Sequence, residues 1–132
     1  MRSITRKNMG KKILIIEDEE TLNKSIADFV VAEKFEVINS LDGESGLEMA
    51  RKELPDLILL DIVLPKKDGY EVLDELKKDE KTKDIPVILL TNLESQEDIV
   101  KAFEKGATTY LVKSDYKLQD VVKKIKAALG MI

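Results

Sequence analysis

The sequence predicts an α/β fold, a doubly wound five-stranded parallel sheet with strand order 2-1-3-4-5. Five short apolar runs alternate with five helical patterns, which is typical of a parallel sheet covered on both faces by helices. The runs at residues 13–16, 57–60 and 87–90 are fully apolar and should lie in the middle of the sheet. The runs at 35–40 and 109–112 contain polar residues and should form its edges. The order 3-2-1-4-5 would expose the wrong strands.

Each run is followed by an amphipathic helical pattern, with apolar residues three or four positions apart. Pro55 follows the second pattern and Gly106 the fourth, and both residue types are common where a helix ends. The residues expected to face the sheet are Leu22, Ile26, Phe29 and Val30 in the first helix, Leu47, Ala50 and Leu54 in the second, Tyr70, Leu73 and Leu76 in the third, Ile99, Ala102 and Phe103 in the fourth, and Leu118, Val121, Val122, Ile125 and Leu129 in the fifth.

The composition excludes several classes of function. The chain has 132 residues, of which 43% are hydrophobic and 36% charged, as expected for one globular domain. A net charge of −4 argues against direct nucleic-acid binding, and no apolar run is long enough to span a membrane. The absence of cysteine excludes disulfides and fits a reducing compartment, so we expect a cytoplasmic protein. The absence of histidine excludes Ser-His-Asp catalysis, imidazole metal ligands and an internal phosphohistidine.

The first ten residues differ from the rest of the chain. They are basic and polar and lack the apolar core of a signal peptide. We expect residues 1–10 to be a disordered tail or a vector remnant, with Met9 as an alternative natural start. Residues 11–130 should form the single domain.

The third apolar run leads directly into a carboxylate. Residues 56–65 read Asp-Leu-Ile-Leu-Leu-Asp-Ile-Val-Leu-Pro, so Asp61 stands at the end of a strand buried on both faces. Open α/β sheets bind ligands outside the carboxyl ends of their strands. Taken alone, Asp61 is more simply explained as a cap of the next turn. Its significance therefore depends on the other strand ends.

Polar side chains follow the other interior strands and the last strand as well. Glu17 and Asp18 follow the first strand, Thr91 ends the fourth and Lys113 follows the fifth. Each has an ordinary explanation, such as acids favoured in the first turn of a helix or a lysine at the surface. Parallel strands about 4.8 Å apart nevertheless bring all these ends to one edge. Their coincidence there favours a functional site.

The residue types indicate phosphoryl chemistry. Three carboxylates in one place repel one another and call for a cation, and oxygen ligands without His or Cys select Mg²⁺. A metal-bound carboxylate that faces a lysine and a threonine hydroxyl can receive a phosphoryl group, with the aspartate as nucleophile. The sequence has no glycine-rich phosphate-binding loop, so no bound nucleotide is expected.

These residues closely resemble those of the receiver domain of response regulators in two-component signalling. The resemblance extends to Leu64-Pro65 and Asp68-Gly69, which follow the third strand, and to Tyr110 in the fifth strand. The resemblance covers essentially residues 11–130 and implies a (βα)5, flavodoxin-like fold. It also implies a single-domain switch that is not an enzyme beyond its own phosphorylation and dephosphorylation. A histidine kinase or histidine phosphotransfer protein would supply the phosphoryl group. A downstream protein would bind the face formed by the fourth helix, the fifth strand and the fifth helix.

The resemblance also assigns a role to each residue of the site. Asp61 would be the phosphoacceptor, Mg²⁺ would be bound directly by Asp18, Asp61 and the backbone carbonyl of Val63, and Glu17 would contact the ion mostly through water. Thr91 would donate a hydrogen bond to the phosphoryl group, and Lys113 would form an ion pair with it. Tyr110 would be the aromatic switch, and Val63 and Asn92 would control the lifetime of the phosphoryl group.

The sequence departs from the family pattern at two positions. Leu64 replaces the usual methionine, which is a mild change, and Ser114 replaces the proline that usually follows the lysine. A cis bond costs roughly 2.5–4 kcal/mol before a residue other than proline. We therefore expect a trans Lys113–Ser114 bond, with Lys113 still reaching Asp61 through its long side chain.

Two other interpretations remain open from the residues. One is a Mg²⁺-dependent phosphatase or phosphotransferase with an aspartyl-phosphate intermediate. Enzymes of the haloacid-dehalogenase type usually carry the nucleophile and a second acid two residues later on the first strand, whereas here the first strand ends in Glu17-Asp18 and residue 63 is Val. The other is a receiver-like scaffold that no longer accepts phosphate, against which the complete set of acids, Thr91 and Lys113 argues.

Overall fold

The computed structural model describes residues 10–91, 96–113 and 117–131, and the expected N-terminal tail lies almost entirely outside them. Strands and helices alternate along the described chain. Their bounds are β1 Lys12–Ile16, α2 Glu20–Ala32, β2 Glu36–Ser40, α3 Gly43–Glu53, β3 Leu57–Asp61, α4 Gly69–Lys78, β4 Val87–Thr91, α5 Gln96–Glu104, β5 Thr109–Val112 and α6 Leu118–Ala128.

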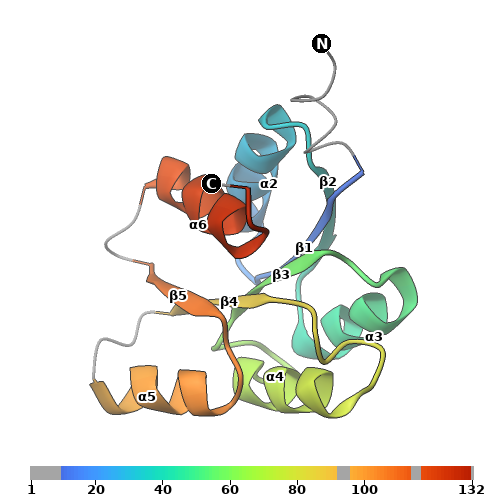
Figure 1. Ribbon diagram of the computed structural model, residues 1–132, viewed down its shortest axis with the longest axis vertical. Coiled ribbons are helices and arrows are strands. Elements are labelled where there is room, and N and C mark those ends of the chain that lie inside the picture. Colours follow the sequence, from blue (N-terminus) through green and yellow to red (C-terminus); the bar gives the residue numbers. More distant parts are fainter. Residues whose placement is uncertain (1–9, 92–95, 114–116, 132) are drawn as a thin grey trace.

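The five strands form one parallel sheet in the order β2-β1-β3-β4-β5, which confirms the predicted topology. Helices α2 and α6 cover one face of the sheet, and α3, α4 and α5 cover the other (Figure 1). The fully apolar strands β1, β3 and β4 occupy the middle, where both faces are buried. The strands with polar residues, β2 and β5, are the edges, as the sequence pattern predicted.

Each face of the sheet has its own hydrophobic core. Alternate residues of one strand point to opposite faces, so Ile58 and Leu60 pack against α3 and α4, whereas Leu57 and Leu59 pack toward α2 and α6. All four side chains are fully buried. The central strands are thus fixed from both sides, which holds the residues at their ends in constant positions. No helix among the described residues has the length and apolar character needed to cross a bilayer.

Two residues expected to face the sheet do not. Leu54 is 50% exposed because α3 ends there in a left-handed conformation, with φ 46°, which turns its side chain off the inward stripe. Phe103 is 45% exposed, whereas its neighbour Ala102 is buried. Consecutive helical residues point about 100° apart, and here Ala102 takes the inward direction, which leaves Phe103 toward the surface. The predictions for Leu54 and Phe103 were therefore wrong.

Candidate functional site

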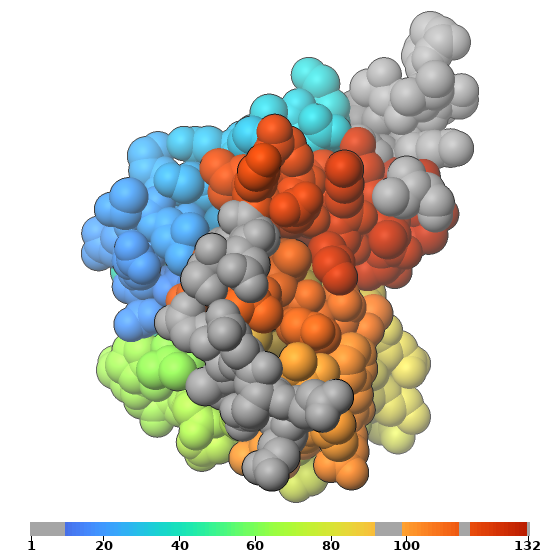
Figure 2. All heavy atoms as spheres, turned by 90° about the vertical axis from the view of Figure 1, so that its left-hand side faces the viewer, coloured from blue at the N-terminus to red at the C-terminus, as the bar shows by residue number. Residues whose placement is uncertain are grey.

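The predicted polar residues meet at the carboxyl edge of the sheet. Ile16 pairs with Leu60, so Glu17 and Asp61 follow at the same level of adjacent strands. On the other side of β3, Asp61 pairs with Leu90, the residue before Thr91. Figure 2 looks onto this side of the molecule, where segments far apart in the sequence lie close together, from α2 in blue through green to the orange and red C-terminal part.

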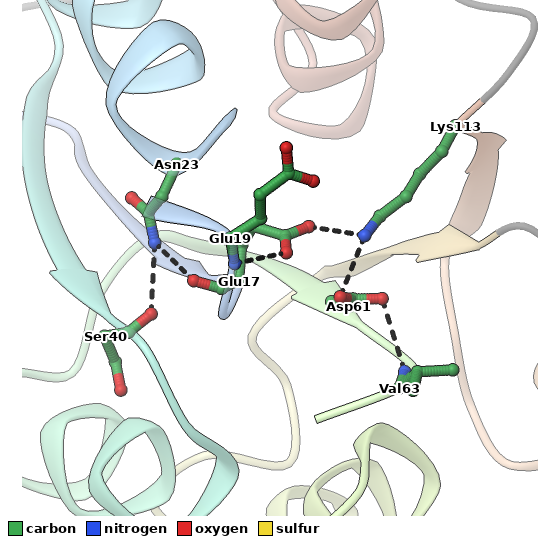
Figure 3. A network of polar contacts seen from close by, with 7 residues as sticks. All are labelled: Glu17, Glu19, Asn23, Ser40, Asp61, Val63 and Lys113. Atoms are coloured by element: carbon green, nitrogen blue, oxygen red, sulfur yellow. Dashed lines mark hydrogen bonds and ion pairs between the residues drawn. The ribbon is translucent and has the colours of Figure 1, made fainter. Parts of the chain in front are cut away.

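A shared ion pair is the centre of the site. The Nζ atom of Lys113 lies 2.9 Å from Oδ2 of Asp61 and 2.7 Å from Oε1 of Glu17 (Figure 3). Glu17 is fully buried and Asp61 is only 3% exposed. Lys113 follows β5, so one cation from the edge of the sheet neutralises carboxylates carried by two interior strands. Such buried charges require this pairing.

The carboxylates form a cluster suited to a hard cation. One oxygen each of Glu17, Asp18 and Asp61 lies within 4.8 Å of the others, and Asp18 is exposed while the other two are buried. Lys113 pairs with two of the three, Glu17 and Asp61, so the three acids together carry more negative charge than this lysine neutralises. An all-oxygen donor set with excess negative charge fits Mg²⁺.

Burial changes the protonation of Glu17. It raises the pKa of this carboxyl from its ordinary 4.5 to about 7, although hydrogen bonds from Lys113 and from the Glu19 N–H oppose the rise. Burial lowers the pKa of Lys113, but its hydrogen bonds to Glu17 and Asp61 outweigh burial and leave that pKa above its ordinary value. The lysine therefore remains charged, and Glu17 is the group that titrates near neutral pH.

The loop after β3 turns sharply at the central aspartate. The Val63 N–H donates to Oδ1 of Asp61 at 3.3 Å, and the Gly69 N–H donates to the Ile62 carbonyl at 2.7 Å. A Cβ atom on Gly69 would overlap the Asp61 carbonyl oxygen, so only glycine permits this approach. Asp68 then caps α4 by accepting the Glu71 N–H at 3.0 Å. Val63, two residues after Asp61, is left 67% exposed.

The remaining predicted residues lie around this centre. Thr91 is buried at the end of β4, one residue beyond the level of Asp61. Tyr110 is half-buried on β5, with its ring edge-on to Phe103 at a centroid distance of 6.0 Å. Asn92 and the bond between Lys113 and Ser114 lie outside the described residues, so those two predictions stay untested.

One residue of the site escaped the sequence analysis. Asn23 lies on the inward stripe of α2, and its side chain donates hydrogen bonds to the carbonyls of Glu17 and Ser40. The signal was present in the sequence, because Asn23 is three residues before Ile26 and seven before Val30 and so belongs to an otherwise apolar stripe. A polar residue on such a stripe requires buried partners.

Comparison with known proteins decides the family. The family described as the response regulator receiver domain matches residues 13–126. The chain belongs to this family. Among solved structures, a CheY-like receiver domain from Methanospirillum hungatei superposes with a TM-score of 0.84 at 30% identity, covering 91% of this chain and 94% of that one. The flavodoxin-like fold is thereby confirmed, and the interpretation as a phosphatase of another family is disfavoured.

Other relatives show the receiver domain in several settings. The receiver domain of the sensor histidine kinase PA1611 from Pseudomonas aeruginosa, solved with a magnesium ion in its active-site cleft, has a TM-score of 0.83 and 27% identity, covering 92% of this chain and 98% of that one. PleD from Caulobacter vibrioides is 39% identical over 80% of this chain and 23% of its own length. CiaR from Streptococcus pneumoniae is 42% identical over 89% of this chain and 51% of its own length. The receiver domain described here thus spans about half or less of these curated relatives.

Proposed function

We propose that this receiver domain is a phosphorylation-activated switch in which Asp61 accepts a phosphoryl group. The observation that carries the proposal is the shared ion pair, in which Lys113 contacts both Asp61 and Glu17 at the carboxyl edge of the sheet. A lysine in this position already compensates negative charge beside Asp61. It can therefore also compensate the negative charge that a phosphoryl group would add.

The acid cluster is the proposed site of Mg²⁺. Asp18, Asp61 and the Val63 carbonyl would bind it directly, and Glu17 would act mostly through water. The bound ion would supply positive charge to the oxygens of the transferring group. Exposure of Asp18 leaves the cluster open to solvent ions, whereas the Glu17 carboxyl is buried behind it, and burial raises its pKa to about 7. Metal loading should therefore depend on the ionised form of Glu17.

Three residues of this chain would each have a separate part in the phosphoryl transfer. An Asp61 oxygen forms a bond to phosphorus, the P–N bond of the donor's phosphohistidine breaks, and its electron pair stays on the imidazole nitrogen of the donor. Lys113, now paired with Asp61 and Glu17, would form an ion pair with the phosphoryl oxygens, and the Thr91 hydroxyl would donate a hydrogen bond to one of them. The donor would be a histidine kinase or a histidine phosphotransfer protein, and it would be a separate protein, because this chain contains no histidine of its own to phosphorylate.

The signal would leave through protein binding. Phe103 on α5 is exposed and contacts Tyr110 on β5, so the face formed by α5, β5 and α6 presents an aromatic pair to a partner. We assign the switch to Tyr110, whose position would respond to phosphorylation of Asp61. The domain of residues 11–130 would catalyse only its own phosphorylation and dephosphorylation, in the cytoplasm, without binding nucleic acid or membrane.

Intact-mass measurement after incubation with acetyl phosphate and Mg²⁺ tests the acceptor. The wild-type protein should gain one phosphoryl group, and Asp61→Asn should gain none because its amide is not a nucleophile. The control is Asp28→Asn, which removes an exposed carboxylate from α2 and should label normally. Full labelling of Asp61→Asn, or labelling that persists in excess chelator, would overturn the proposal. Repeated hydrolysis of a generic phosphomonoester would instead indicate an enzyme.

A further inference from the structure

A buried amide lies directly behind the acid cluster. Asn23 is only 2% exposed and shares the inward stripe of α2 with Ile26. Its Nδ2 donates to the carbonyl oxygens of Glu17 at 3.0 Å and Ser40 at 3.1 Å, and its Oδ1 accepts from Nδ2 of Asn39 at 2.5 Å. A buried primary amide is unfavourable unless its polar atoms are paired, and here both ends of the amide are.

These bonds hold the chain where β1 leaves the sheet. The Ser40 carbonyl also accepts the Glu17 N–H at 3.1 Å. Both backbone polar groups of Glu17 are therefore fixed, the N–H by β2 and the carbonyl by Asn23, whose hydrogen bonds Figure 3 shows. Carbonyl oxygens can only accept hydrogen bonds. The NH₂ end of the Asn23 amide must therefore face them, which makes the amide orientation unambiguous.

We propose that Asn23 is a positioning residue for the divalent-cation site. The carbonyl of Glu17 and the backbone nitrogen of Asp18 belong to one planar peptide group. Holding that carbonyl therefore fixes the plane of this peptide group and the position of the Asp18 Cα atom, from which the side chain extends to the cluster. Asp18 is the exposed acid of the cluster, and its carboxylate lies within 4.8 Å of those of Glu17 and Asp61. Asn23 thus places a cation ligand without contacting the cation.

The inference rests on the proposed function, because it concerns the cation that phosphorylation would need. It differs from a purely structural role for Asn23, in which the amide only attaches α2 to the sheet. A structural role would make the loss of Asn23 equivalent to any other loss of packing in α2. A positioning role predicts that the loss of Asn23 weakens cation binding and alters the Asp18 peptide group more than an equally destabilising change elsewhere in α2 does.

The test compares Asn23→Leu, which has a similar shape but no donor, with Ile26→Ala, which removes packing from the same stripe. Calorimetric titration with Mg²⁺ should show a dissociation constant raised about tenfold or more for Asn23→Leu, the range seen when supports of metal ligands are removed. Ile26→Ala should stay within about twofold of wild type. If Asn23→Leu does not fold, Asn23→Ser is measured by the same criteria.

A second readout needs no metal. In ¹H–¹⁵N spectra of the metal-free protein, the Asp18 amide resonance should shift in Asn23→Leu and not in Ile26→Ala, because the lost hydrogen bond belongs to the same peptide group. An unshifted Asp18 amide, equal Mg²⁺ affinity in Asn23→Leu and wild type, equal losses in both variants, or no Mg²⁺ binding by wild type would overturn the inference. Wild type that binds Mg²⁺ but is not labelled by acetyl phosphate would instead refute the proposed function alone.

Discussion

Replacing Glu17 with glutamine should stabilise the metal-free protein at pH 8. The wild-type side chain is fully buried, with Oε2 accepting the Glu19 N–H at 2.9 Å and Oε1 facing Lys113 at 2.7 Å. Glutamine has nearly the same shape and keeps an oxygen for the Glu19 N–H. It removes the buried negative charge, while Lys113 retains its ion pair with Asp61 at 2.9 Å.

The magnitude follows from the pKa of Glu17, which burial raises from 4.5 to about 7. The folded protein binds this proton more tightly than the unfolded chain does. The free energy of unfolding therefore falls as the pH rises from about 4.5 to about 7. At about 1.4 kcal/mol for each tenfold change in a protonation equilibrium, the loss is about 3 kcal/mol. Glutamine does not titrate, so Glu17→Gln should be up to about 3 kcal/mol more stable at pH 8.

Thermal unfolding in chelator at pH 8 and pH 5 measures the difference. The variant should unfold about 10 °C above wild type at pH 8, and the gap should nearly close at pH 5, where wild-type Glu17 is protonated in the folded state. The control is Glu48→Gln, an exposed acid on α3, which should show no such pH dependence. Mg²⁺ should stabilise wild type more than Glu17→Gln. A variant less stable than wild type at pH 8, or a gap that is the same at both pH values, would refute the reasoning.

Three further results are expected. Mg²⁺ affinity should fall about tenfold from pH 8 to pH 6 because protons compete for Glu17, whose pKa burial raises to about 7; a flat calorimetric profile would contradict this. Val63→Asn should release the phosphoryl group about tenfold faster, since valine offers no side-chain hydrogen bond to orient the attacking water; equal decay of the labelled mass would refute it. The ring resonances of Tyr110 should shift when Asp61 is phosphorylated, and a partner should then bind with changed affinity; identical spectra and affinities would exclude the switch.

The sequence predicted the sheet because burial on both faces leaves a simple pattern. A strand in the middle of a parallel sheet must be apolar at every position, so the central runs could be ordered before any contact was known. The strand ends then identified Asp61, Thr91 and Lys113, because parallel strands share one edge. The predicted reach of Lys113 to Asp61 is confirmed by the ion pair at 2.9 Å. The second ion pair, with Glu17, could not be predicted, because periodicity carries no information about which further carboxylates the lysine reaches.

The errors have equally local causes. Leu54 was assigned to the core from its spacing, but the helix ends in a left-handed residue there and its side chain is exposed. Phe103 was assigned inward from its spacing of four residues after Ile99, although of the two neighbours only Ala102 is buried. Asn23 was overlooked because an asparagine reads as polar surface. Its acceptors are backbone carbonyls of Glu17 and Ser40, which every residue has and no sequence pattern reveals.

The shared ion pair has a consequence for folding of the chain during its synthesis. Glu17 and Asp61 are both synthesised well before Lys113, which follows the final strand. A nascent chain that has paired β1 with β3 would therefore hold two carboxylates side by side without their lysine. Those two carboxylates would repel each other until β5 joins the sheet and brings Lys113 between them. This repulsion would destabilise the carboxyl edge of a sheet that lacks β5. In a cell, dissolved divalent cations would be the natural substitute for Lys113 during that interval.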